Sequence, residues 1–274
     1  MKFRLYRQFG ALNSRPIFDA FEKGIKHLGY QSVDRGEDIA VIWSVLWNGR
    51  MANNRNVYFD CLQKKIPVMI IEVGNLLRNQ SWRISLDNIN AAGKFAADAD
   101  IDPIRLSKFN LDFFSIKENR SPAILIASQH DRSLQWEGMP PMAEWIKQTI
   151  YSIRKFTDRP IVLRPHPRCI IKVPEVEIQM PVQVPGTYDS FDLKFDYHCV
   201  INHNSGPAIH AAMAGTPVIC DVSSLAYPVS DKIENIETPI LPDRTDWAIR
   251  LANTEWFVDE IAQGIPQQRL ISLL

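Results

Sequence analysis

Several residue patterns are missing from this chain of 274 residues. It has only four cysteines (Cys61, Cys169, Cys199 and Cys220), and no two of them stand in the CxxC spacing that is typical of zinc sites. Scattered cysteines of this kind predict reduced thiols. They do not indicate a disulfide framework or a metal centre. We therefore expect a cytoplasmic protein with no bound metal.

Long hydrophobic runs and an excess of charge are missing as well. No apolar run approaches the roughly 18 residues that a membrane-spanning helix needs, and the basic start MKFRLYRQFG lacks the apolar core of a signal peptide. Lys and Arg together number 31, as do Asp and Glu, which predicts only weak nonspecific binding to nucleic acid. The halves differ, since residues 1–115 have 16 basic against 12 acidic residues (+4) and residues 116–274 have 15 against 19 (−4). The basic first half favours a polyanionic partner.

The chain does contain a regular alternation of strand-like and helix-like segments. In the first half, strands are predicted at 3–6, 39–43 and 68–73, and helices at 17–28 and 57–65. In the second half, strands are predicted at 123–127, 161–163, 199–201 and 217–220, and helices at 142–156, 207–214, 246–253 and 255–261. The acidic and polar stretch 98–121 interrupts this rhythm. The pattern predicts an α/β fold of two Rossmann-like domains, 1–115 and 116–274, that face each other across a cleft.

A rigid polar turn follows one predicted strand of the second half. His166 stands between two prolines, which fix its backbone, and Arg164 and Arg168 lie on either side of it. A histidine and two arginines at the carboxyl end of a parallel strand are suited to bind a phosphorylated ligand. The alternative is a structural histidine at the end of a strand.

A second polar turn joins the strand at 199–201 to a helix of small residues. It consists of His203, Asn204, Ser205, Gly206 and Pro207, with Pro207 at the first helical position and Asn204 or Ser205 as the cap. Amide groups, a hydroxyl and a flexible glycine at a helix start can bind a phosphate. An ordinary helix cap is the alternative.

A third loop, after the strand at 123–127, is expected at the same edge of the sheet. Its polar residues are Ser128, Gln129, His130 and Asp131. Loops at this edge face the ligand crevice in doubly wound folds, although such a loop can also be merely solvated.

These motifs together resemble the donor half of GT-B glycosyltransferases of the capsule-polysaccharide, sialyl- and Kdo-transferase type. The resemblance covers residues 120–274 and includes the helix closed by Ala-Gly-Thr-Pro-Val at 214–218 and the tail residues Trp256, Glu260, Ile261 and Gly264. It implies that His166, Asn204 and Ser205 hold the phosphates of a nucleotide sugar, which acts as co-substrate with no further cofactor. His210 and Ala211 depart from the serine or acidic residue of those families, so the nucleotide stays open: we expect a UDP-sugar, with a CMP-sugar as the alternative.

The first half is similar to segments in small glycosyltransferases of bacteriophage genomes. The residues that carry this similarity are Ile70 to Asn75, followed by Arg78, Trp82, Arg83 and Asn88. Some of those enzymes act on hydroxymethylated pyrimidines in DNA. The similarity implies DNA as a partner and, for a phage-encoded protein, the host cytoplasm as its location.

Glu72 is the candidate catalytic base because it ends a strongly apolar strand, where partial burial would suit a carboxylate that removes a proton from an acceptor hydroxyl. A helix cap or a pair with Arg78 is the alternative. The aromatic and basic residues expected to bind the acceptor are Trp47, Arg50, Arg55, Arg78 and Arg83. The alternative for them is core packing and an exposed turn.

The sequence therefore predicts a metal-independent glycosyltransferase that moves a sugar from a nucleotide-sugar donor to a hydroxyl acceptor. Hydroxymethylpyrimidine in DNA is slightly preferred as the acceptor over a glycan or a lipid-linked saccharide. Two other classes stay open: a nucleotide-sugar epimerase of the same fold, with His130 or Asp131 as acid or base, and a non-catalytic nucleotide-sugar-binding module.

Overall fold

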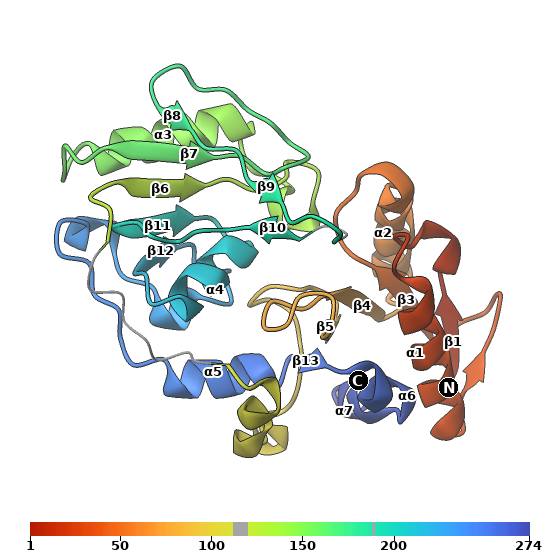
Figure 1. Ribbon diagram of the computed structural model, residues 1–274. Helices are drawn as coiled ribbons and strands as arrows, with labels where there is room; N and C mark the ends of the chain where they lie inside the picture. Colours follow the sequence, from red (N-terminus) through yellow and green to blue (C-terminus); the bar gives the residue numbers. More distant parts are fainter. Residues whose placement is uncertain (112–119, 188–189) are drawn as a thin grey trace. The chain divides into compact units, whose positions relative to one another are not determined.

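The chain folds into two compact units, each built around its own β-sheet (Figure 1). The computed structural model describes residues 1–111, 120–187 and 190–274. The first unit comprises 1–111, 132–135 and 249–274, and the second comprises the described residues between 120 and 248 other than 132–135. The predicted boundary between residues 115 and 116 lies outside the described residues. The tail from Ile249 onward differs from the expectation, because it belongs to the first unit.

The first unit has a six-stranded sheet in the order β13-β5-β4-β3-β1-β2. Four of its strands are mutually parallel: β1 (Lys2–Leu5), β2 (Gln31–Ser32), β3 (Ile39–Trp43) and β4 (Val68–Val73). The other two, β5 (Trp82–Leu86) and β13 (Glu255–Trp256), pair antiparallel, β5 with β4 and β13 with β5. Strand β13 therefore brings the end of the chain into the sheet that the beginning of the chain starts.

Helices cover both faces of this sheet. On one face lie α1 (Arg15–His27), α6 (Val258–Ala262) and α7 (Ile265–Ile271), and on the other lies α2 (Asn54–Lys64). Val41 and Trp43 pack in the first cluster, and Ala40 and Ile42 in the second, as strand alternation requires. The short 3-10 helices of this unit are η1 (Arg7–Phe9), η2 (Gly49–Met51), η3 (Asp98–Asp100) and η4 (Pro103–Phe109).

The second unit has a parallel five-stranded sheet in the order β12-β11-β6-β7-β8. Its strands are β6 (Ile124–Ala127), β7 (Ile161–Arg164), β8 (Glu177–Ile178), β11 (Cys199–Asn202) and β12 (Val218–Cys220). A small antiparallel pair, β9 (Val182–Gln183) and β10 (Phe191–Asp192), stands apart from this sheet.

The helices of the second unit include α3 (Met142–Ile153), which packs on the Ile126, Leu163 and Ile201 side of the sheet. Helix α4 (Gly206–Met213) joins β11 to β12, and its buried alanines allow close packing. Helix α5 (Thr245–Ala252) runs from the second unit into the first. The remaining short helices are η5 (Leu134–Trp136), η6 (Tyr227–Val229) and η7 (Ile233–Asn235).

The alternation of strands and helices is confirmed, and several details differ from the expectation. The short strands β2, β8, β9 and β10, strand β5 and helix α7 were not expected, and the predicted helix at 255–261 begins as strand β13 before α6. Glu255 and Trp256 take an extended form because they pair with Arg83 and Trp82 of β5. Gly264 follows α6 with φ +84°, in the left-handed conformation expected of a residue that ends a helix. Within the described ranges, every helix is too short or too polar to cross a bilayer.

Candidate functional site

Four strands of the second unit end in one row at the carboxyl edge of the sheet. Arg164 of β7 pairs with Ala127 of β6, and Asn202 of β11 pairs with Cys220 of β12. Asn202 also reaches β6, because its Nδ2 donates a hydrogen bond of 2.7 Å to the carbonyl of Ala127. The polar turns that the sequence placed after these strands therefore lie at one edge, where parallel α/β sheets bind ligands.

Arg164 is a buried cation. Only 5% of the residue is exposed, and its guanidinium lies 4.6 Å from the ring centroid of Phe195. Burial lowers the pKa of Arg164 to about 10, although the nearby Tyr197 acts in the opposite direction. Among the described residues, Nη2 has no hydrogen-bond partner. A buried charge without a counter-charge is costly, so this position favours an anionic ligand.

Two further buried polar atoms lie in the adjoining turns. The hydroxyl of Ser128 and Oδ1 of Asn204 have no hydrogen-bond partner within the described ranges. Gln129 joins the two turns, because its Oε1 accepts a 3.3 Å bond from the amide of Asn204. Asn204 is held further by a 2.8 Å bond from its Nδ2 to Ser223 Oγ. Buried polar groups without partners are rare, and their clustering at this edge is typical of a ligand site.

The start of helix α4 is shaped by Asn202. Its Oδ1 accepts the amide of Ser205 at 2.8 Å, and its Nδ2 donates to Ser205 Oγ at 2.9 Å. Ser205 is the N-cap in an extended conformation, and its hydroxyl makes no capping bond. Because Oγ accepts from Asn202, its own proton points elsewhere and can serve a ligand, next to Gly206. Sequence reasoning missed Asn202, whose signal was an amide ending an apolar strand.

His166 is held in one tautomer by its own turn. The amide of Arg168 donates to His166 Nδ1 at 3.1 Å, so Nδ1 is an acceptor and the proton of the neutral ring lies on Nε2. His130 is buried 5.2 Å away between ring centroids, and its Nδ1 lies 3.3 Å from Asp131 Oδ1. The side chain of Arg168 is exposed, so its backbone amide is the part that shapes this turn.

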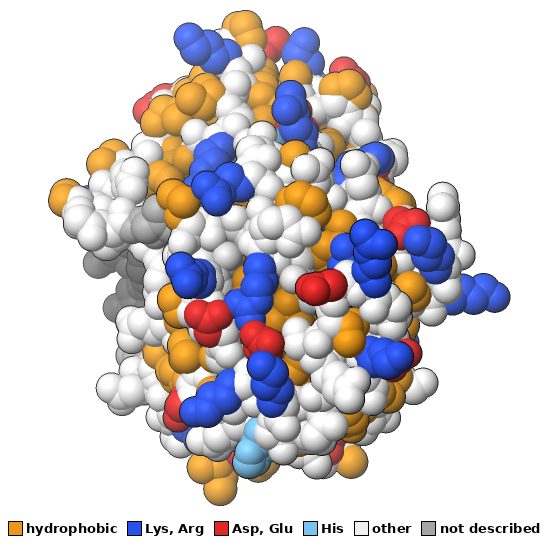
Figure 2. Space-filling view, turned by 90° about the vertical axis from the view of Figure 1, so that its right-hand side faces the viewer, with side chains coloured by type: hydrophobic (Ala, Val, Ile, Leu, Met, Phe, Trp, Pro, Cys, Tyr) orange, Lys and Arg blue, Asp and Glu red, His pale blue; other side chains and the backbone are white. Residues whose placement is uncertain are grey.

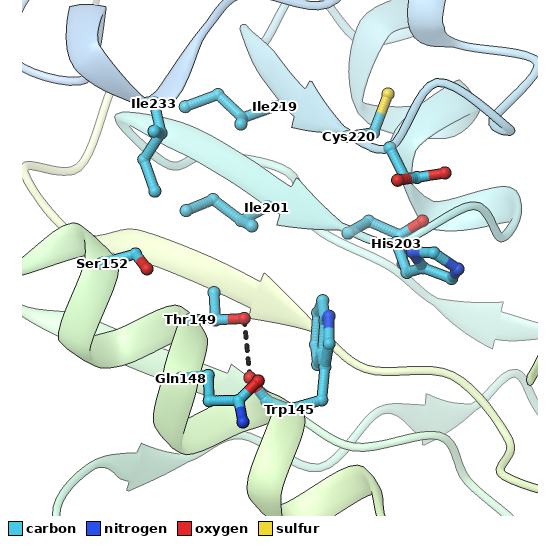
Figure 3. Close-up of a pocket in the computed structure, with 11 residues that line it drawn as sticks. Trp145, Gln148, Thr149, Ser152, Ile201, His203, Ile219, Cys220 and Ile233 are labelled. Carbon is cyan, nitrogen blue, oxygen red and sulfur yellow. Dashed lines mark hydrogen bonds between the residues drawn. The ribbon is translucent and has the colours of Figure 1, made fainter. Parts of the chain in front are cut away.

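His203 is an aromatic wall rather than a phosphate-binding cation. Its ring packs edge-on against Trp136 at 5.3 Å and lies 6.5 Å from Trp145. Burial lowers the pKa of His203, although Asp221 acts in the opposite direction, so the ring is neutral at pH 7. His203 lines a cavity of about 270 Å³ between α3 and strands β11 and β12 (Figure 3).

One group in the described part of the chain has the composition of a metal site. Ligand atoms of His130, Asp131 and Cys169 all lie within 4.8 Å of one another. Three donors are one fewer than a structural zinc site uses, and they match the number in an open catalytic site. No residue spacing in the sequence indicates this group, because His130 and Cys169 follow different strands.

In the first unit, Glu72 belongs to a polar row across three strands. Arg83 of β5 pairs with Glu72 of β4 on one side and with Glu255 of β13 on the other. Ser44, which has a positive φ of 62°, donates a 2.6 Å bond to Glu72 Oε2. Burial lowers the pKa of Arg83, and both carboxylates oppose this effect. Glu72 is half-buried, and its carboxylate accepts hydrogen bonds from the Ser44 hydroxyl, just after β3, and from the amide of Val73 at 3.0 Å.

The residues expected to bind the acceptor lie in different environments. Trp47 is 6% exposed and packs in the core cluster of α2, and Arg83 is 7% exposed in β5. The side chains of Arg50, Arg55 and Arg78 are exposed, and Arg55 lies over the ring of Phe59 at 4.8 Å. Only these three arginines are therefore placed to meet a large ligand directly.

Comparison with known proteins identifies the fold. No protein-family model matches the chain, and no curated protein sequence is similar to it. A solved structure of a β-Kdo 2,4-transferase, KpsC of Thermosulfurimonas dismutans, is similar with a TM-score of 0.53 and 11% identity over 94% of this chain and 92% of that chain. A β-Kdo 2,7-transferase of the same name and organism gives 0.49 and 14% over 97% and 99%. The chain therefore has a fold like that of GT-B glycosyltransferases.

Proposed function

We propose that this protein is a glycosyltransferase that moves a sugar from a nucleotide-sugar donor to a hydroxyl acceptor. The observation that carries the proposal is the buried Arg164, whose Nη2 has no partner among the described residues, beside Ser128, whose hydroxyl has none there either, at the carboxyl edge of a parallel sheet. An anionic ligand bound at this edge would accept hydrogen bonds from both the Arg164 guanidinium and the Ser128 hydroxyl. The fold is similar to that of a β-Kdo 2,4-transferase, and the activity itself is our inference.

In this proposal the second unit binds the phosphates of the donor. Arg164 supplies positive charge, and the Nε2 proton of His166, the Ser205 hydroxyl and the Gly206 amide supply hydrogen bonds. These groups stabilise the negative charge that develops on the phosphate as its bond to the sugar breaks. Arg164 thereby takes the place of a metal ion, and the reaction is metal-independent. A UDP-sugar is the expected donor, and a CMP-sugar is the alternative.

The first unit is proposed to supply the base. Glu72 accepts the proton of the acceptor hydroxyl while that oxygen forms a bond to the anomeric carbon, and the nucleotide leaves with the electrons of the broken bond. The fixed position of Glu72, held by Ser44 and by the row through Arg83, favours this role over a flexible surface carboxylate.

For the acceptor we place a saccharide hydroxyl first and hydroxymethylpyrimidine in DNA second. The face shown in Figure 2 mixes Lys and Arg with Asp and Glu and has no continuous basic track. On and beside α1, Arg7 pairs with Asp19 and Glu22, and Lys26 pairs with Glu22. Paired cations bind a phosphate backbone poorly, and this weakens the expectation of DNA.

The test is a donor and acceptor panel on the purified protein. Thermal shift with UDP- and CMP-sugars identifies the donor, because a bound ligand raises the melting temperature. Product analysis with oligosaccharides, plain DNA and hydroxymethylated DNA then identifies the acceptor. Transfer to any of these supports the proposal. An epimer formed without acceptor would make the protein an epimerase, and binding with no turnover would make it a binding module.

A further inference from the structure

The cavity on the α3 side of the second sheet lies beside the donor-phosphate turn. Trp145, Gln148 and other side chains of α3 face Ile201 and Ile219 on strands β11 and β12 (Figure 3). Asn202 and His203 line the end of the cavity at the carboxyl edge. Asn202 is also the residue that bonds to Ser205, so the cavity and the phosphate turn share a wall.

The cavity is lined by both apolar and polar side chains. The floor is apolar, and one wall has the indole of Trp145, which lies edge-on to Trp136 at 5.7 Å between centroids. Gln148 offers its amide oxygen as an acceptor, since its Nε2 donates to Glu144 Oε1 at 2.9 Å, and Asp221 also offers acceptors. An aromatic wall with a few placed polar groups is typical of sites for small ring-shaped ligands.

The exposed carboxylate of Asp221 at the rim of the cavity disfavours phosphate there and favours hydroxyl groups. Burial raises the pKa of Asp221, but the hydrogen bonds from the hydroxyl and amide of Ser223 outweigh this effect and lower it, so the carboxylate is ionised at pH 7. Its Oδ1 accepts the amide of Ser223 at 2.9 Å and its hydroxyl at 2.6 Å. An ionised carboxylate repels phosphate and accepts hydrogen bonds from neighbouring hydroxyls, as acidic residues do from ribose in dinucleotide sites.

We propose that this cavity binds the hydroxylated ring next to the donor phosphate, against Trp145 and with its hydroxyls on Asp221 and Gln148. The inference rests on the proposed function, because the ring enters as part of a phosphorylated donor held at the adjoining turn. Two rings of a nucleotide sugar have this chemistry, the ribose and the transferred sugar, and the experiment below separates them.

The experiment measures three ligands by calorimetry: pyrophosphate, UDP and glucose 1-phosphate. The variants are Trp145→Leu and Asp221→Asn, and Tyr151→Ala is the control, because Tyr151 lies on the same helix and is 68% exposed. Each cavity variant is expected to weaken one ring-containing ligand about tenfold, the loss of roughly one good contact. Pyrophosphate binding and the control are expected to stay unchanged.

The outcomes distinguish a failure of the cavity assignment from a failure of the proposed donor site. Weaker binding of UDP places the ribose in the cavity, and weaker binding of glucose 1-phosphate alone places the transferred sugar there. If both ligands bind the variants as tightly as the unaltered protein, the cavity assignment is wrong while the phosphate site stands. If the unaltered protein binds none of the three ligands, the UDP-sugar site and the cavity assignment that depends on it are both wrong. A loss of pyrophosphate binding in the cavity variants would also overturn the assignment, because it would show that they disturb the phosphate turn.

Discussion

The guanidinium of Arg164 lies 4.6 Å from the ring of Phe195, and no acidic side chain of the described residues forms an ion pair with it. The contrast within the chain is Arg105, which is equally buried and holds Glu260 through two hydrogen bonds of 2.7 and 2.8 Å. The charge of Arg105 is thus balanced by Glu260, whereas no carboxylate of the described residues balances the charge of Arg164. This difference supports the ligand-binding role that we propose for Arg164.

Arg164→Met is expected to abolish most donor binding without destabilising the protein. The variant removes a charge that the free protein buries without a counter-ion, so its melting temperature stays equal or rises. Donor affinity falls by roughly 1.5–3 kcal/mol, the value of a hydrogen bond to a charged group. Calorimetry and thermal unfolding measure the two effects. Arg159→Met is the control, since Arg159 pairs with Glu237 at the other end of β7. Normal donor affinity in Arg164→Met would remove this arginine from the site.

His166→Ala is expected to weaken donor binding by a similar amount, roughly 1.5–3 kcal/mol, because the Nε2 proton is lost. His166→Asn keeps an N–H donor and is expected to lie between the alanine variant and the unaltered protein. Calorimetry with the donor compares the three. Equal affinities throughout would show that the imidazole does not touch the ligand.

Glu72→Gln is expected to lose turnover while donor affinity stays unchanged, because the amide keeps the shape of the side chain and cannot take a proton. The expected fall in kcat is roughly 100- to 10,000-fold, the range of general base catalysis. Asp60→Asn is the matched control, because Asp60 is an exposed carboxylate on α2 that pairs with Lys64. If both variants turn over normally, another group takes the proton.

A chelator is expected to leave transfer unchanged, because Arg164 carries the charge that a metal would supply. Activity is measured before and after treatment with EDTA, with Cys169→Ser as a companion variant. If EDTA removes the activity, zinc restores it and the Cys169→Ser variant is inactive, a metal would instead be assigned to His130, Asp131 and Cys169.

Stability is expected to fall between pH 4.5 and pH 2 through the Arg105–Glu260 pair. Burial raises the pKa of Glu260, but Arg105, the amide of Phe257 and Lys108 outweigh burial and bring it to about 2. A carboxyl with a depressed pKa stabilises the fold above its ordinary pKa, and this contribution is lost as the pH falls to the folded value. The loss amounts to roughly 3 kcal/mol. Urea unfolding of the protein and of Glu260→Gln across this range measures it, and an unchanged difference between the two would contradict the assignment.

The elements that the sequence predicted well are those whose pattern is local. Strands 39–43 and 68–73 are continuous apolar runs, and the structure gives them the predicted bounds. The turns at His166 and Asn204 were likewise placed at one sheet edge, because parallel strands bring their carboxyl ends together.

The missed features depend on partners far away in the chain. Glu255 and Trp256 become a strand only because β5 lies beside them, and no local signal contains that information. Asn202 and Arg164 look alike in sequence, as polar ends of apolar strands. The structure distinguishes them, because Asn202 bonds to Ser205 whereas Arg164 lies against the ring of Phe195.

Strand β13 has a consequence for the order in which the protein is made. Chains emerge from the ribosome beginning at the amino terminus, and domains generally fold as they emerge. Here the sheet that contains residues 2–5 is completed only by Glu255 and Trp256, which are synthesised after the whole of the second unit. The second unit can thus be complete before the first, although the first begins the chain. A product truncated between residues 249 and 254 would contain the whole second unit and a first unit without β13, so that strand β5 would be an open sheet edge.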